Sequence, residues 1–325
     1  MTTPFDLQTI QQAAALLAPH IVQTPLLSAP KLDSELGFQL FLKAEGLQTT
    51  GSFKLRGALN KILTLPEQDR TQGVIAFSAG NHGQAVSAAA RLVGCKATIV
   101  LPNVAPRVKI DNCRWWGATV VLYDPDTEDR REVSRKIAEE QGLTLIHPYD
   151  DHAVMAGQGT AGLEIVAQLA ARQITPDAIA INCSGGGLAA GVSTALRAAH
   201  PDIAIHLTEI AGFEKWARSL RSGRPESNDP VARTIIDGIN GPLVGTRPLA
   251  TLLELPNVHG LSVNDEEVLV GMRAAFTHLG IVLEPAGAAS LGALIRDRDA
   301  FKGQRVVVIG TGANVDPAVF ARALA

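Results

Sequence analysis

Short apolar runs alternate with helical patterns along most of the chain from about residue 70 onward. Such runs, bounded by glycine, proline or charged residues, are typical of buried strands. We expect strands at residues 73–79, 96–102, 118–123, 143–148, 177–183, 203–209 and 305–312.

The segments between these runs carry apolar residues at helical spacing. We expect helices at 83–94, at a segment opened by Pro106, at 128–141, at 188–200 and at 284–298. Gly94 is placed to close the first of them, Thr127 to cap the charged one, and Asp6 to cap a helix near the N-terminus. Strands that alternate with helices predict an α/β fold, with open, mostly parallel sheets flanked by helices.

Length and composition agree with a globular protein of this class. The 325 residues suit one large α/β unit or two lobes, and 46% of them are hydrophobic. The formal net charge of −3 gives no electrostatic reason to expect nucleic acid or an anionic membrane as a partner. No apolar run approaches membrane-spanning length and the N-terminus does not resemble a signal peptide, so we expect a cytoplasmic protein.

The three cysteines, Cys95, Cys113 and Cys183, are scattered along the chain. They form no CxxC pair and no spacing of cysteine and histidine that is typical of metal ligands. We therefore expect neither a disulfide framework nor a zinc site.

Three loops rich in small residues follow expected strands: SAGNHGQ at 78–84, CSGGGLAAG at 183–191 and GTGANVD at 310–316. Ligands in α/β folds bind where loops leave the carboxyl ends of strands, and glycine lets backbone N–H groups approach a ligand closely. The second loop also precedes an expected helix, so its N–H groups suit an anion such as phosphate. A tight turn without a ligand is the alternative.

A dinucleotide site is a further alternative for the second loop. Gly185, Gly187 and Ala190 fit the GxGxxA spacing, and Glu209, at the end of the next strand, is placed to bind a ribose hydroxyl. This match would indicate an NAD-dependent oxidoreductase, but it leaves the loop at 78–84 unexplained.

The segment TTGSFKLRGALNK, residues 49–61, places Lys54 among small and apolar residues at the expected start of a helix. Such a lysine is either a surface residue whose stem covers apolar groups or an amine retained for chemistry. In a partly desolvated pocket the amine loses basicity, so its neutral form can attack a carbonyl and carry a proton. The segment alone leaves both interpretations open.

Taken together, these segments resemble the fold-type II pyridoxal-phosphate enzymes, specifically the serine/threonine dehydratase and serine racemase group. The resemblance covers nearly the whole chain and rests on several unlinked motifs in the family's order. The motifs are LKAEGLQTTGSFKLRGA at 42–58, SAGNHGQA at 78–85, HPYDD at 147–151, AGQGTAGLEI at 156–165, CSGGGLAAG at 183–191, EPAGAA at 284–289 and TGANVD at 311–316.

This resemblance implies a two-lobed, tryptophan synthase β-like fold with the cofactor between the lobes. Residues 1–65 and 146–325 would form the large cofactor-binding domain, and residues 66–145 the small domain. It also implies a homodimer. The chain ends at Ala325, shortly after the last motif, so we expect no C-terminal regulatory domain of the kind that lets isoleucine inhibit biosynthetic threonine dehydratases.

The resemblance also assigns roles in binding pyridoxal 5'-phosphate. Lys54 would hold the cofactor covalently as a Schiff base, and Phe53 would pack against its ring. Backbone N–H groups would hold the phosphate at Ser184, Gly185, Gly186, Gly187 and Leu188. The family usually has a further glycine where Ser184 stands, and a serine still offers its N–H group.

Further roles follow from the other motifs. Asn81 would bind the phenolic oxygen of the cofactor, and Glu284 matches an acidic position near it, with a helix N-terminal carboxylate as the alternative. Thr311 would lie opposite the pyridine nitrogen, where a neutral hydroxyl gives a weaker electron sink that suits β-elimination. The substrate carboxylate would bind at Ser78, Ala79, Gly80, Asn81 and His82. We expect no proton transfer by His82.

The implied reaction is α,β-elimination of a β-hydroxy L-amino acid to a 2-oxo acid and ammonia, with Lys54 as the general base. Serine racemases need a second acid/base on the opposite face, a serine immediately before the Gly-Asn of this loop. Here that position is Ala79, whose methyl group carries no proton. We therefore predict a dehydratase, or ammonia-lyase, with an amino-acid racemase as the alternative. A non-catalytic amino-acid sensor would not need the intact lysine and cofactor loops.

The substrate and the cation site are less defined. Serine, threonine, a 3-hydroxyaspartate and phenylserine all carry the reacting hydroxyl. Arg130 and Arg131 are placed to meet a second carboxylate, although a charged helix more often carries such residues on its surface. Relatives hold a cation near the position of Glu209, but alignment puts Phe213 and Lys215 at the other two ligand positions. We expect Lys215 to pair with Glu209 in place of a metal, unless Glu214 supplies a ligand.

Overall fold

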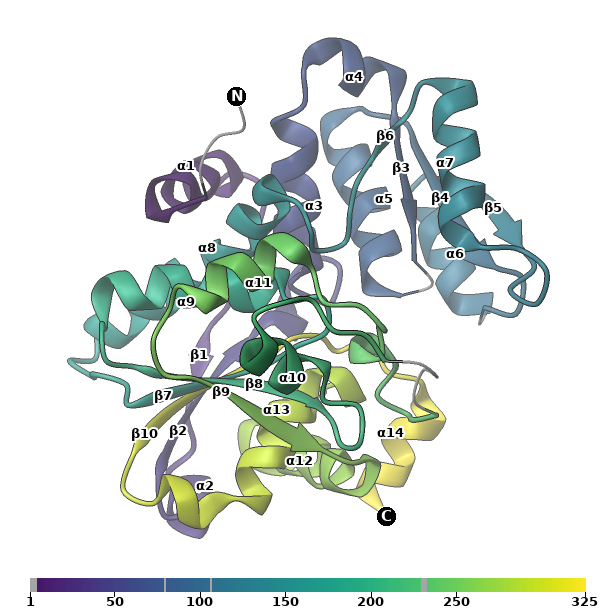
Figure 1. The fold of residues 1–325 in the computed structure, drawn as a ribbon. Coiled ribbons are helices and arrows are strands. Elements are labelled where there is room, and N and C mark those ends of the chain that lie inside the picture. Colours follow the sequence, from purple (N-terminus) through teal and green to yellow (C-terminus); the bar gives the residue numbers. More distant parts are fainter. Residues whose placement is uncertain (1–4, 79, 106, 229–232) are drawn as a thin grey trace.

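A computed structural model describes residues 5–78, 80–105, 107–228 and 233–325 of the protein. Its strands form one six-stranded and one four-stranded sheet, which lie in separate parts of the molecule with helices around both (Figure 1). The α/β class and the two-lobed architecture expected from the sequence are confirmed. Among the described residues, no helix combines the length and the apolar composition that crossing a bilayer requires.

The six-stranded sheet has the order β1-β2-β10-β7-β8-β9, and only β1 runs antiparallel to its neighbour. Its strands are β1 Leu26–Leu27, β2 Gln39–Ala44, β7 Ala178–Asn182, β8 Ala204–Ile210, β9 Val258–Val263 and β10 Arg305–Gly310. Successive residues of β10 enter different cores: Val306 and Val308 one, Val307 and Ile309 the other. The sheet is therefore buried on both faces, which explains its continuous apolar runs.

Helices cover both faces of this sheet. One face packs against α2 Pro30–Leu36, α12 Asp265–Leu279, α13 Pro285–Arg296 and α14 Pro317–Leu324. The other packs against α8 His152–Ala170, α9 Gly187–Ala199, α10 Lys215–Ser222 and α11 Thr246–Leu253. The helix α1 Leu7–Leu17 lies on α8, and the short turns are η1 Glu45–Leu47, η2 Asp237–Ile239 and η3 Arg298–Phe301.

The four-stranded sheet has the order β5-β4-β3-β6 and is parallel throughout. Its strands are β3 Val74–Phe77, β4 Ala97–Pro102, β5 Thr119–Tyr123 and β6 Thr144–Leu145. One face packs against α3 Lys54–Leu63, α5 Asn81–Val93 and α6 Arg107–Trp115, and the other against α7 Arg130–Gln141, while α4 Glu67–Gln72 leads into β3. Because α3 precedes the expected boundary at residue 65 yet packs here, the domain limits stay a prediction.

The helix ends agree with the expected caps except at one position. Asp6 caps α1 through a capping box with Thr9, and Gly94 closes α5 in the left-handed region. Thr127 was the wrong cap for α7, which begins at Arg130. Asp129 caps it instead, because its extended backbone lets the carboxylate accept the N–H groups of Arg131 and Glu132. Pro106 lies outside the described residues.

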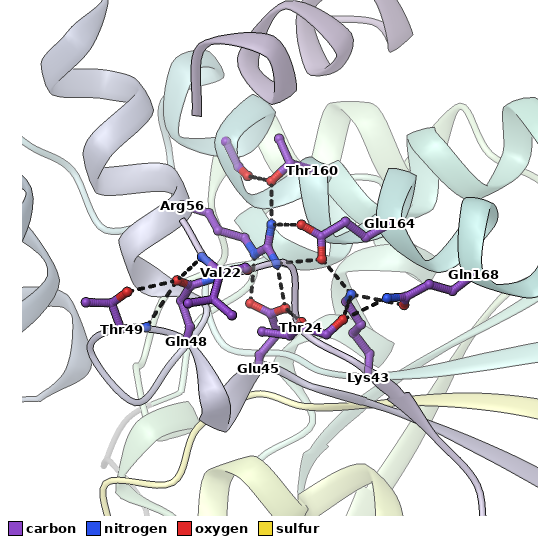
Figure 2. A network of polar contacts seen from close by, with 11 residues as sticks. Val22, Thr24, Lys43, Glu45, Gln48, Thr49, Arg56, Thr160, Glu164 and Gln168 are labelled. Atoms are coloured by element: carbon purple, nitrogen blue, oxygen red, sulfur yellow. Dashed lines mark hydrogen bonds and ion pairs between the residues drawn. The ribbon is translucent and has the colours of Figure 1, made fainter. Parts of the chain in front are cut away.

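A buried charge network joins the start of α3 to the six-stranded sheet (Figure 2). Arg56 donates to Glu45 at 2.8 and 2.9 Å and to Glu164 of α8 at 2.6 and 2.9 Å. Lys43 of β2 contacts the same Glu164 at 2.6 Å. Burial alone would raise the pKa of Glu45, but Arg56, together with Lys43 and the Thr24 hydroxyl, outweighs it and holds this pKa below its usual value.

We expect Arg56→Met to destabilise the protein strongly. The substitution leaves the buried carboxylate of Glu45 without its ion-pair partner, which costs roughly 3–5 kcal/mol, while Glu164 keeps its contact with Lys43. Arg135→Met on the exposed face of α7 is the matched control, since Arg135 also contacts two carboxylates, Glu132 and Glu139, but in water. Urea denaturation should show a large loss for the first variant and no measurable change for the second. Equal effects would contradict a structural role for the network.

Candidate active site

A cleft of about 1120 Å³ is lined by loops of both sheets. Every predicted site residue that the structure describes lies on its wall: Phe53, Lys54, Ser78, Gly80, Asn81, His82, Ser184, Gly185, Gly186, Gly187, Leu188, Glu284 and Thr311. Ala79 lies outside the described residues. The sequence motifs, which are far apart along the chain, therefore meet at one place.

Lys54 is the first residue of α3 and faces this cleft rather than the outer surface. Its Nζ donates to the carbonyl oxygen of Pro148 at 3.0 Å, and desolvation lowers the pKa of its amine to about 8. The residue before it is fixed to the end of β10, because the N–H group of Phe53 donates to the carbonyl of Thr311 at 3.2 Å. Lys54 is thus held where its neutral amine can react.

The loop at Ser184–Leu188 connects β7 to α9, which begins at Gly187. The first N–H groups of a helix have no partners within the helix, and the helix dipole adds positive potential there. Gly186 has φ +96°, and a Cβ atom on it would overlap the Trp216 ring. A Cβ atom on Gly185 would overlap the Tyr149 ring. The glycines therefore allow both rings to support a backbone that is suited to a phosphate.

Asn81, at the start of α5, is held by two side chains from the other lobe. Its Nδ2 donates to Glu284 at 2.5 Å, and its Oδ1 accepts from Asn314 at 2.7 Å. Burial raises the pKa of Glu284 to about 8, so this carboxyl carries a proton at neutral pH. Glu284 stands at the N-cap of α13 but makes no capping hydrogen bond. Its contact is therefore with Asn81, not with the helix end.

Thr311 and His82 are both uncharged. Thr311 accepts from Asn182 at 3.1 Å and donates to the carbonyl of Ala286 at 3.3 Å. Burial lowers the pKa of His82 to about 3, and its Nε2 donates to the carbonyl of Ile146 at 2.8 Å. His82 thus contacts the end of the segment that contains β6, and its predicted role at the substrate carboxylate stays a prediction.

Several residues that line the cleft, and Trp216 behind its glycine loop, had no predicted role. Tyr149 and Trp216 support the glycine loop, Asn314 orients Asn81, and His147 packs edge-on against the Tyr149 ring with centroids 4.7 Å apart. Tyr149 and His147 lie in the HPYDD motif, and Asn314 lies in TGANVD, so the motifs contained the signal without indicating the contacts. Trp216 had no such signal.

Arg130 and Arg131, at the start of α7, line the same cleft although both are solvent-exposed. The Arg130 guanidinium lies 5.6 Å from the centroid of the Phe77 ring. Arg130 and Arg131 are therefore surface residues of a charged helix, as expected, and they also lie at the cleft.

The dinucleotide alternative is not supported by the geometry at Glu209. Both of its carboxylate oxygens accept the N–H group of Trp216, at 2.9 and 3.0 Å, and one also accepts from Ala217. Glu209 is 1% exposed. It is therefore not available to a ribose hydroxyl.

The cleft combines groups that fit pyridoxal phosphate. The Lys54 amine suits its aldehyde, the start of α9 suits its phosphate, and the Thr311 hydroxyl suits a ring nitrogen. The contacts described above hold each of these groups in place at the cleft. The cleft volume leaves space for a small substrate beside such a cofactor.

Comparisons with known proteins agree with this fit. The model of the family described as pyridoxal-phosphate dependent enzyme matches residues 17–312. The chain is 41% identical to an L-threo-3-hydroxyaspartate ammonia-lyase of Pseudomonas sp, over 94% of each chain. It is 34% identical to a serine racemase of Oryza sativa subsp. indica, over 96% of this chain and 91% of that one. The crystal structure of a T.th. threonine deaminase superposes with a TM-score of 0.89 at 39% identity, covering 96% of this chain and 99% of that one.

The matched segment includes all the cleft loops up to Thr311. The similarity to the relatives extends over nearly the whole chain and is therefore much longer than a shared motif. The chain belongs to the family of pyridoxal-phosphate dependent enzymes, and its cofactor is pyridoxal phosphate.

Proposed function

We propose that this enzyme is an ammonia-lyase that converts a β-hydroxy L-amino acid to a 2-oxo acid and ammonia by α,β-elimination. The observation that carries the proposal is the Lys54 amine, with a pKa of about 8, at a cleft where Thr311 offers a neutral hydroxyl. The ammonia-lyase of Pseudomonas sp and the T.th. threonine deaminase support the same reaction class.

Lys54 acts as the general base in this proposal. Pyridoxal phosphate, when bound, supplies the electron sink that makes the proton on the substrate Cα acidic. Desolvation keeps a large fraction of the Lys54 amine neutral near pH 8, which is the form that accepts this proton. The Pro148 carbonyl, 3.0 Å away, holds one N–H group and so limits the orientations of the amine.

The loop after β3 would bind the substrate carboxylate. Gly80 and Asn81 stand at the start of α5, where N–H groups and the helix dipole favour an anion. The N–H group of Gly80 donates to Ser78 Oγ at 3.2 Å, which fixes the turn. The protonated Glu284 would keep the Asn81 amide turned toward the cofactor without adding negative charge to the cleft.

A second carboxylate on the substrate would explain the two arginines at the cleft. Arg130 and Arg131 belong to the start of α7, and no ion pair holds either of them among the described residues. Guanidinium groups bind carboxylates through charge-assisted hydrogen bonds. We therefore place 3-hydroxyaspartate ahead of threonine and serine as the substrate.

Elimination is proposed ahead of racemisation because of Ala79. This residue lies outside the described residues, and the argument rests on its chemistry alone: a methyl group cannot return a proton to the opposite face of Cα. A cytoplasmic location, a homodimer and the domain limits at residues 65 and 146 likewise stay predictions.

A substrate panel tests the reaction and its substrate together. The purified, cofactor-loaded enzyme receives L-threo- and erythro-3-hydroxyaspartate, L-threonine, L-serine and phenylserine, and 2-oxo acid and ammonia are followed. We expect the highest kcat/KM for a 3-hydroxyaspartate, with oxo acid and ammonia in equal amounts. Chiral analysis of the same samples should show no D-isomer, whereas Ala79→Ser should form some. D-isomer without oxo acid from the unmodified enzyme would make it a racemase.

Two variants, Arg130→Met and Arg131→Met, test whether these arginines select the substrate, and threonine serves as the control substrate. Removing a guanidinium that binds the second carboxylate should lower kcat/KM for 3-hydroxyaspartate by about tenfold or more, as expected for a charged hydrogen bond of roughly 1.5–3 kcal/mol. The value for threonine should stay within about twofold. Equal losses on both substrates would place the arginines outside substrate selection.

The lowered pKa of Lys54 predicts how the apoenzyme captures its cofactor. Only the neutral amine attacks an aldehyde, so the capture rate should fall about tenfold per pH unit below pH 8 and level off above it. An ordinary lysine, with a pKa of about 10.4, would still gain rate up to that pH. Stopped-flow absorbance of the apoenzyme mixed with pyridoxal phosphate measures this. A rate that keeps rising beyond pH 9.5 would contradict the desolvated amine.

A further inference from the structure

A buried ion pair lies beside the loop that is proposed to hold the cofactor phosphate. Glu209 of β8 is 1% exposed and Lys215, the first residue of α10, is 2% exposed. Lys215 Nζ lies 3.7 Å from Glu209 Oε1. Burying two charges is costly unless each is paired and hydrogen-bonded, so the surrounding contacts show what the pair does.

The family resemblance implies a cation at this place, with Glu209, the carbonyl of the residue at 213 and the side chain at 215 as ligands. The structure does not fit it. The carbonyl of Phe213 already accepts from Asn228 at 2.7 Å and from the N–H group of Lys215 at 2.9 Å, which uses both lone pairs. The third position is an ammonium group, which repels a metal ion.

Among the residues that the structure describes, no other group restores the ligand set. Glu214, the alternative acidic residue, accepts the N–H group of Gly212 at 2.8 Å. The hollow beside Lys215 has no volume that a water molecule could occupy, and it is lined by Ile210, Phe213, Asn228, Ile239, Asn240 and Gly241. Within the described segments, no cluster of three or more histidine, cysteine, aspartate and glutamate residues is arranged to hold a metal.

Glu209 also holds the start of α10 and, through it, the glycine loop. Its carboxylate accepts the N–H groups of Trp216, at 2.9 Å, and Ala217, at 3.1 Å. Trp216 is fully buried, and its indole N–H donates to the carbonyl of Ser184 at 2.6 Å. The same ring fills the space that a side chain on Gly186 would need. Direct contacts therefore lead from Lys215 through Glu209 and Trp216 to the loop.

We propose that Lys215 is a built-in cation that takes the place of a divalent metal and positions the phosphate loop through Glu209 and Trp216. Cofactor binding in this enzyme then needs Lys215 and does not need divalent cations. Lys215 is a positioning residue, because it touches neither the cofactor nor the substrate. The inference holds for any substrate and rests only on the proposed role of Ser184–Leu188.

The unmodified protein supplies the first test. Apoenzyme is prepared with EDTA, and its dissociation constant for pyridoxal phosphate is measured by fluorescence titration in EDTA, in Mg²⁺ and in Ca²⁺. We expect values within about twofold of one another and the same urea midpoint for the holoenzyme. Cofactor binding that weakens tenfold in EDTA and returns with either cation would overturn the proposal.

Lys215→Met supplies the second test. It removes the charge with little change in volume and leaves Glu209 unpaired, so pyridoxal phosphate should bind at least tenfold more weakly. Arg296→Met is the matched control, because Arg296 also pairs with a glutamate, Glu267, but this pair joins the end of α13 to α12 and does not contact the loop. It should lower the urea midpoint and leave cofactor affinity within about twofold. Equal changes in affinity would reduce Lys215 to a general stabilising role and overturn the proposal.

Trp216→Phe separates the two parts of the inference. It removes the donor to Ser184 but keeps the ion pair, and we expect weaker cofactor binding with no response to divalent cations. Weak binding by this variant together with normal binding by Lys215→Met would show that the loop assignment holds and that the role of Lys215 is wrong. Ammonia release by the unmodified enzyme tests the proposed reaction separately.

Discussion

The position of Lys54 depends on the ion pairs of the buried Arg56 guanidinium. Arg56 follows Lys54 by half a turn of α3 and is fixed between Glu45, after β2, and Glu164, on α8. Because Arg56 and Glu45 are fully buried and Glu164 is only partly exposed, the ion-paired geometry has few alternatives. The start of α3 is held to the six-stranded sheet, while the rest of the helix packs on the four-stranded one. Lys54 therefore stands at the junction between the lobes.

Contacts across this junction complete the site. Asn81 comes from the smaller sheet, whereas Glu284 and Asn314, which hold its amide, come from the larger one. Two helix starts, those of α5 and α9, point their N–H groups into the same cleft. In the proposed function, backbone dipoles at these helix starts would bind the cofactor phosphate and the substrate carboxylate, and desolvation would keep part of the Lys54 amine neutral. Beside the loop at Ser184–Leu188, the ammonium group of Lys215 balances the charge of the Glu209 carboxylate.

Much of this arrangement was predictable because it is encoded locally. Apolar runs predicted the sheets, Gly94 and Asp6 predicted helix ends, and the motif around Lys54, once the family was recognised, predicted a lysine at the cleft. The predicted N-cap of α7 was wrong because Thr127 and Asp129 are both residue types that suit an N-cap. Only the backbone conformation decides which of them caps the helix. Tertiary contacts could not be predicted from local patterns. The hydrogen bond between Asn81 and Glu284, for example, joins residues that are far apart in the chain. The support of the loop by Tyr149 and Trp216 depends on ring positions that no periodicity indicates.

If Lys54 is the amine that binds the cofactor aldehyde, reduction of the holoenzyme with borohydride should label this residue. Borohydride reduces a carbon–nitrogen double bond between a lysine and the cofactor to a stable linkage, which survives digestion and can be located by mass spectrometry. We expect to find the pyridoxyl group on the peptide that contains Lys54, at about one group per chain. A label on another lysine, such as Lys61 or Lys215, or a reduced protein without any label, would contradict it.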